Sequence, residues 1–187
     1  LALDGIVSEQ PAAVDPLALL TGAAAPVHEY AARDIIHALR TAKGDDRVKL
    51  ILLDLDRFLG GGQVTLSDIA TEIAAVKKAG KPVLSYASLY TNDAYQLAAA
   101  GSDIWVNPMG GAIVAGPGGS RLYYKDLIDR LGVKAHVYRV GTYKSAVEPY
   151  LLTEASPEAK AAETALYSEL WEQWLTDVKA ARPQADI

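Results

Sequence analysis

The chain has 187 residues, a length typical of one domain; half of them are apolar and 22% are charged, which describes a folded protein and excludes a disordered one. The net charge of −5, without any cluster of Lys or Arg, argues against a nucleic-acid-binding surface. There is no cysteine, which excludes disulfides, thiolate catalysis and Cys-based zinc sites.

The beginning of the sequence indicates a fragment of a longer protein. It starts without Met, directly in the apolar stretch Leu1-Ala2-Leu3-Asp4-Gly5-Ile6-Val7. A protein rarely begins in the middle of a strand, so we expect targeting or anchoring segments outside this chain. Within it, no apolar run approaches the roughly 20 residues of a membrane-spanning helix, and no signal-peptide pattern is present.

Apolar runs and helical periodicities alternate along the chain, and the predicted elements are as follows. Strands are expected near 1–8, 48–55, 82–87, 103–106 and 135–140. Helices are expected over 29–43, 66–79, 93–100, 122–131 and 157–181. Loops are expected over 9–27, which has room for one helical turn at 17–20, and over 110–119, a glycine-rich turn region around a short Ala-Ile-Val strand.

Two of the predicted elements, the strand at 48–55 and the helix at 157–181, have additional sequence signals. The run Val48–Leu55 is almost entirely apolar, as in a strand buried on both faces of a parallel sheet. The last helix has a local start signal, with Ser156 as its N-cap and Pro157 at its first position. Strands that alternate with helices predict an α/β fold with a largely parallel central sheet, as one domain over 1–187.

The histidines give no sign of a metal site. His28, His37 and His136 have no neighbours at metal-ligand spacing, so structural or surface roles are expected for all three. No metal and no cofactor is predicted.

Two further features allow a functional and a structural interpretation. Gly60–Gly62 follow a predicted strand, where backbone N–H groups can face an oxyanion or a phosphate, but a tight turn explains them equally well. The helix 157–181 has a wide apolar face, which could bind a partner or a peptide; packing on the sheet or on a second domain is the favoured interpretation. The residues of this face are Leu166, Tyr167, Leu170, Trp171, Trp174, Leu175 and Val178.

The string RVGTYKSAVEP (139–149) follows a predicted strand, which is where α/β sheets place their sites. A lone lysine there is usually a solvated surface residue. The string nevertheless resembles the lysine motif of the signal peptide peptidase A (protease IV) family in its long, two-domain form. The resemblance extends over nearly the whole chain, through the strings LDLDRFLGGGQ, GKPVLSYAS, AAAGSDIWVNPMG, LYYKDLIDRLGVKAHVYRVGTYKS and ELWEQWL.

This resemblance implies a ClpP/crotonase-like spiral α/β fold and peptide-bond hydrolysis by a Ser/Lys dyad. It also implies a homo-oligomer on the periplasmic side of the bacterial inner membrane, which degrades cleaved signal peptides. In the long form the first domain provides the lysine and the second the serine, so only Lys144 falls on a catalytic position. Lys144 is therefore expected to be the general base, acting on a serine outside this chain.

The serine position supports that assignment. In short family members the nucleophile lies at the start of the helix before the strand that ends in Asn-Pro. Here that start falls at about Asn92, which cannot be an acylated nucleophile, so the chain alone is expected to be inactive. A neutral lysine amine can take a serine proton. Because burial favours the neutral amine, Lys144 is expected to be covered by the second domain or a neighbouring subunit.

Several alternatives stay open at this stage. Tyr143, Ser145 and Glu148 are unranked candidates for orienting Lys144. The chain could instead be a non-catalytic assembly or peptide-binding module of the same fold, with an incidental lysine. A self-contained enzyme would need an in-chain serine such as Ser88 or Ser120, and neither has a recognisable nucleophile context.

Overall fold

The computed structural model describes residues 1–12, 27–138, 140, 141 and 143–184. The chain divides into two compact units, one of residues 1–115 with 174–187 and one of residues 116–173. We refer to them as unit 1 and unit 2. The helical turn considered at 17–20 lies outside the described residues, and the prediction of one domain over 1–187 stays a prediction.

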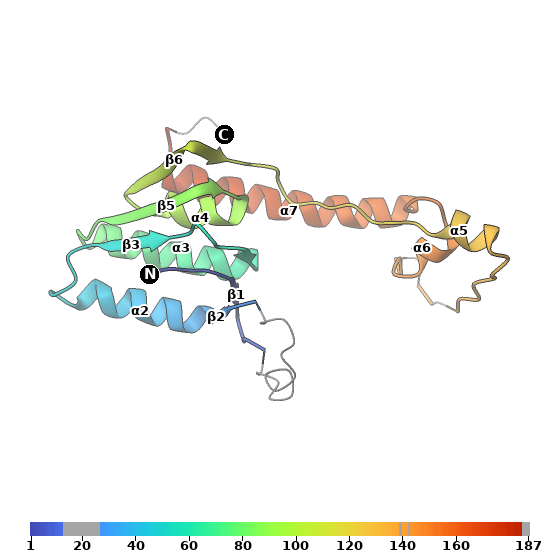
Figure 1. The fold of residues 1–187 in the computed structure, drawn as a ribbon, viewed down its shortest axis with the longest axis horizontal. Helices are drawn as coiled ribbons and strands as arrows, with labels where there is room; N and C mark the ends of the chain where they lie inside the picture. Colours follow the sequence, from blue (N-terminus) through green and yellow to red (C-terminus); the bar gives the residue numbers. More distant parts are fainter. Residues whose placement is uncertain (13–26, 139, 142, 185–187) are drawn as a thin grey trace. The chain divides into compact units, whose positions relative to one another are not determined.

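Unit 1 is built on two three-stranded sheets in which every pair of neighbouring strands is parallel (Figure 1). Their strand orders are β2-β1-β4 and β3-β5-β6. The strands are β1 (Ile6–Ser8), β2 (Glu29–Ala31), β3 (Ile51–Asp54), β4 (Gly60–Gly61), β5 (Val83–Tyr90) and β6 (Asp103–Ala112). Parallel strands separated by helices confirm the predicted α/β class.

Three helices of unit 1 form its core together with the strands: α2 (Ala32–Gly44), α3 (Gln63–Lys78) and α4 (Asn92–Ala100). α3 and α4 pack on one face of the β3-β5-β6 sheet (Figure 1). The core is a single cluster of aliphatic and aromatic side chains from these elements, including Leu39, Leu66, Ile69, Val83 and Leu97.

Burial alternates along β3, which corrects one expectation. Leu53 is buried, but its neighbour Leu52 is 51% exposed. The prediction of a strand buried on both faces is therefore wrong. Side chains of a strand point alternately to the two faces of its sheet. Within the described residues, α3 and α4 pack on β5, the neighbour of β3 in that sheet, and they cover one face of it (Figure 1).

β6 extends further than predicted, through Asn107 and Pro108 to Ala112. Its register against β5 shifts after Ala87, so that residues 107–110 lie opposite Ser88 alone. A bulge of this kind accommodates a proline, which has no N–H for the ladder. A Cβ on Gly110 would lie 1.6 Å from the carbonyl oxygen of Ser88, so only glycine fits this approach.

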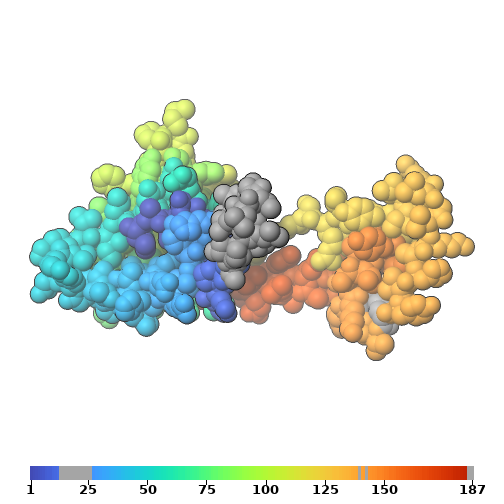
Figure 2. Space-filling model, turned by 60° about the horizontal axis from the view of Figure 1, so that its bottom comes forward, coloured from blue at the N-terminus to red at the C-terminus, as the bar shows by residue number. Residues whose placement is uncertain are grey.

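α2 lies at the surface of unit 1, where it appears in blue (Figure 2). Its inner face buries Ile35 and Leu39, while Arg40 on the outer face reaches Glu72 of α3, with Nη2 2.7 Å from Oε1. Among the described helices, none has both the length and the apolar character required to span a membrane.

Unit 2 contains two short helices, α5 (Lys125–Arg130) and α6 (Glu148–Leu151), and the first part of α7 (Pro157–Ala181). The predicted bounds of α7 are confirmed, and so is its cap, because Ser156 Oγ accepts a hydrogen bond from the N–H of Ala159 at 3.1 Å.

The strand predicted at 135–140 is wrong. Residues 133–138 and 140 are outside any strand, and Tyr138 is 96% exposed. A strand requires a neighbour that accepts and donates its backbone hydrogen bonds. The described part of unit 2 contains no strand that could pair with this segment.

Candidate active site

Lys144 lies in unit 2, on the segment that leads into α6. Its side chain is exposed, and the aliphatic part of that side chain lies over Gly141: a Cβ on Gly141 would be 3.9 Å from Cγ and from Cε of Lys144. Gly141 has φ +104°, a conformation that side-chain-bearing residues rarely adopt. The positive φ therefore favours glycine at this position, three residues before the lysine, whereas a contact of 3.9 Å would leave room for a Cβ.

The three residues considered as partners of Lys144 differ sharply in burial. Tyr143 is 68% exposed, Ser145 is half-buried, and Glu148 is 1% exposed. The Glu148 carboxylate accepts two hydrogen bonds from Ser156, one from the hydroxyl at 2.7 Å and one from the backbone N–H at 3.1 Å. Glu148 is thus fixed inside unit 2, while Lys144 faces solvent.

The start of α4, where a serine would stand in a short family member, is occupied by Asn92 in unit 1. Its side-chain Oδ1 accepts a hydrogen bond from the N–H of Ala115 at 3.0 Å. Its backbone oxygen accepts one from the indole Nε1 of Trp174 at 2.9 Å. Asn92 therefore acts as a structural anchor for the segment that leaves β6 and for α7.

The next residue, Asp93, determines what the glycine cluster does. Its Oδ2 accepts a hydrogen bond from the N–H of Gly61 at 3.1 Å, and a Cβ on Gly60 would lie 2.4 Å from the same oxygen. Gly60 has φ +117°. The glycines thus allow β4 to approach a carboxylate of the protein itself, which favours the structural interpretation of Gly60–Gly62 over an anion cradle.

Burial of Asp93 also has an electrostatic consequence. Desolvation raises the pKa of this carboxyl above its ordinary value, and the hydrogen bond from Gly61 opposes the shift. Sequence reasoning missed Asp93. An acidic residue in the first turn of a helix is common for helix-dipole reasons alone, so the sequence offered no signal that this one is half-buried.

The other candidate residues have these surroundings. The N–H of Ser88 in β5 donates to Asp56 Oδ1 at 2.6 Å, and Ser120 is exposed in unit 2. His28 lies 2.9 Å from Asp4 Oδ1, while His37 and His136 are exposed. Over the described ranges, no group of three His, Cys, Asp or Glu residues could hold a metal ion.

The apolar face of α7 packs in unit 1 over its last turns. Trp174 and Val178 are buried, and the Trp174 ring lies 6.2 Å from the Tyr95 ring, centroid to centroid. In unit 2, Leu166 and Tyr167 on the same helix are exposed. The buried part of this face thus packs against α4, through Tyr95 and Asn92, while its packing on the sheet or on a second domain stays a prediction.

Comparison with known proteins identifies the family. The model of the family described as "Peptidase family S49" matches residues 75–187, more than half of the chain. The chain belongs to peptidase family S49. This membership and the parallel sheets of unit 1 confirm the predicted ClpP/crotonase-like fold class.

Relatives of this S49 chain carry protease names. It is 36% identical to "Protease 4" of Salmonella typhi, over 97% of the chain and 30% of that protein. It is 37% identical to "Protease 4" of Haemophilus influenzae, over 90% of the chain and 27% of that protein. A "Serine protease SPPA, chloroplastic" of Arabidopsis thaliana is 25% identical over 73% of the chain and 20% of that protein. The chain thus spans less than a third of the length of these relatives.

Proposed function

We propose that this chain supplies the general base of a Ser/Lys-dyad serine peptidase, with Lys144 as the base and the serine in a second domain of the same protein. The observation that carries the proposal is that the chain has a candidate base but no candidate nucleophile at the two positions considered. Lys144 is exposed on a turn, whereas the start of α4 carries Asn92 in a structural role. The short span of the chain relative to "Protease 4" leaves room for a second domain that bears the nucleophile.

The proposed chemistry is acyl transfer. The neutral amine of Lys144 takes the proton of the serine hydroxyl as the serine oxygen attacks the scissile carbonyl. The resulting ammonium then gives a proton to the leaving amine, and the C–N bond breaks to leave an acyl-enzyme. Water hydrolyses the ester in a second round of the same proton transfers. Lys144 meets its requirement for a dry environment when the second domain or another subunit covers its turn.

The proposed substrates are signal peptides already removed from secreted proteins, cleaved by a homo-oligomer on the periplasmic side of the bacterial inner membrane. Two relatives above 35% identity are bacterial proteins named as proteases, which supports a bacterial proteolytic role. A surface for partners is available in unit 2, where Leu131, Val133, Tyr138 and Val140 are all exposed.

Substitution of Lys144 in the complete protein tests this role. Lys144→Ala should abolish peptide hydrolysis, by roughly 10²–10⁴-fold or more, because the serine loses its proton acceptor. Lys144→Arg should fail almost as completely, since a guanidinium stays protonated at working pH. Steady-state hydrolysis of an unstructured peptide gives kcat/KM, and circular dichroism establishes that each variant is folded.

Lys134→Ala provides a matched control, because it removes an exposed lysine of the same unit. It should keep wild-type activity. A folded Lys144→Arg protein with near-wild-type hydrolysis would overturn the role of Lys144, and the non-catalytic assembly module would then be the better description.

A further inference from the structure

Glu148 is buried although the proposed chemistry assigns it no step. At 1% exposure, it is the one buried acidic or basic side chain among the described residues. Removing a carboxylate from water is costly unless hydrogen bonds compensate for the lost hydration. Glu148 stands four residues after Lys144, at the end of the turn 145–148, so its contacts determine how this turn is held.

Those contacts lead to the first turn of α7. Ser156 donates to the two oxygens of Glu148, from its hydroxyl to Oε1 at 2.7 Å and from its backbone N–H to Oε2 at 3.1 Å. The same hydroxyl accepts the N–H of Ala159 at 3.1 Å. The Ser156 hydroxyl is therefore used as donor and as acceptor, and it couples the Glu148 carboxylate to the helix.

On its other side, Glu148 is connected to the lysine by backbone turns. The N–H of Glu148 donates to the carbonyl oxygen of Ser145 at 3.0 Å, and its own carbonyl accepts the N–H of Leu152 at 2.8 Å. The following residue, Pro149, accepts the N–H of Tyr124 at 2.7 Å. The turn 145–148, which follows Lys144, is thus hydrogen-bonded at its last residue, Glu148.

We propose that Glu148 is a positioning residue for Lys144: its buried carboxylate binds Ser156 and so fixes the turn 145–148 against the start of α7. This inference rests on the proposed function of Lys144. It ranks the three neighbours of the lysine, because Tyr143 and Ser145 are more exposed than Glu148 and the Glu148 carboxylate spans from this turn to another element. A shift of the turn moves the amine away from the serine, and misplacement by about 1 Å can lower a rate by roughly 10²-fold.

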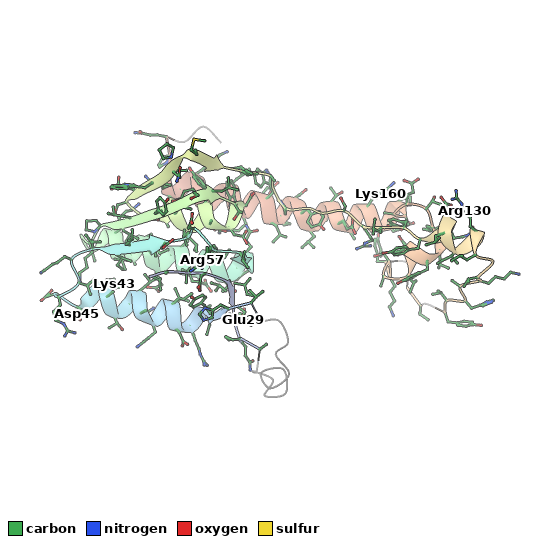
Figure 3. The ribbon with its side chains drawn as sticks, in the orientation of Figure 1. Glu29, Lys43, Asp45, Arg57, Arg130 and Lys160 are labelled. Atoms are coloured by element: carbon green, nitrogen blue, oxygen red, sulfur yellow. The ribbon has the colours of Figure 1, made fainter. Side chains whose placement is uncertain are left out.

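The test compares Glu148→Gln, Ser156→Ala, Ser156→Thr and the double variant Glu148→Gln/Ser156→Ala in the complete protein. The matched control is Glu154→Gln, since Glu154 lies on the same loop but pairs with Lys160 at the surface, Oε2 to Nζ 2.7 Å (Lys160 is labelled in Figure 3). The measurements are kcat and KM for an unstructured peptide across pH, and thermal unfolding.

We expect Glu148→Gln and Ser156→Ala each to lower kcat about 10- to 100-fold with little change in KM. The midpoint of the pH–rate profile should shift, because the displaced amine meets different surroundings. Ser156→Thr, which keeps the hydroxyl, should restore most of the activity. The double variant should be no worse than the poorer single variant, since both break one connection. A merely structural role would lower the folded fraction and leave the midpoint unchanged.

Each other outcome overturns the inference. A folded Glu148→Gln protein with the kinetics of Glu154→Gln removes the positioning role, while an inactive Lys144→Ala protein still supports the proposed function. If Glu148→Gln does not fold, a folded Ser156→Ala protein with wild-type kinetics overturns the inference instead. Activity in Lys144→Ala overturns the proposed function, and the positioning role with it.

Discussion

Asp93 shows how one residue changes the meaning of a motif. A glycine cluster after a strand can present its N–H groups to a ligand, but here the N–H of Gly61 is used by Asp93 Oδ2 at 3.1 Å. The φ of +117° at Gly60 and its contact with the same carboxylate explain why glycine is needed there. The Asp93 carboxylate thus occupies the position next to the glycines where a bound anion could otherwise lie.

The raised pKa of Asp93 predicts a pH-dependent stability. The unfolded chain has an aspartate of ordinary pKa, 3.8, so in the window between that value and the raised pKa the folded protein binds more protons. Asp93 therefore lowers the free energy of unfolding as the pH rises through this window. Asp93→Asn keeps an oxygen for Gly61 and removes the charge, so near pH 7 it should be at least as stable as the wild type.

Thermal unfolding of both proteins from about pH 4 to 7 checks this expectation. The stability advantage of Asp93→Asn should shrink as the pH falls towards 3.8, because the wild-type carboxyl then becomes neutral as well. An advantage of the wild type that grows towards neutral pH would contradict the raised pKa.

Among whole elements, those with local start and stop signals were predicted best. α7 begins at Pro157 after the Ser156 cap and ends at Ala181, as the sequence indicates, because its cap and its helical period are local properties. The strand expected at 135–140 failed because a strand depends on a partner distant in sequence. β6 was predicted too short because a bulge opposite Ser88 lets it continue through Pro108.

The same distinction applies to the candidate site. Lys144 could be singled out from a contiguous motif. The burial of Glu148 could not be predicted in the same way, because it and the hydrogen bonds to Ser156 depend on how the loop folds back on α7. Asn92 was placed correctly at the start of a helix, but its bonds to Ala115 and Trp174 depend on contacts distant in sequence.

The Trp174 anchor gives a prediction at the scale of the element. Trp174 is 3% exposed, and its indole donates to the Asn92 oxygen. Trp174→Phe should lose about 1 kcal/mol from the missing hydrogen bond, and Trp174→Ala about 3–5 kcal/mol from the cavity. Leu166→Ala on the same helix, at 56% exposure, should change stability by less than about 0.5 kcal/mol. Chemical denaturation measures all three, and equal losses for Trp174→Ala and Leu166→Ala would contradict the anchor.

At the scale of the whole molecule, several apolar side chains of unit 2 within about 13 residues of Lys144 in the sequence are exposed. Leu131, Val133, Tyr138, Val140 and Tyr143 are all exposed. Where such side chains form one patch, that patch is typical of a contact with another domain or subunit. This observation favours a complete protein in which the segment around Lys144 is covered, as the proposed base requires.

Activity should therefore belong to the complete protein and not to this chain. Residues 1–187, expressed alone and established as folded by circular dichroism, should hydrolyse unstructured peptides no faster than their Lys144→Ala variant. The physical reason is the proposed location of the nucleophile in a second domain: Asn92 at the start of α4 cannot be acylated, and it is hydrogen-bonded to Ala115 and Trp174. Ser88→Ala and Ser120→Ala are the decisive variants. Turnover by the isolated chain that disappears when Ser88 or Ser120 is replaced would mean a self-contained enzyme with that serine as its nucleophile.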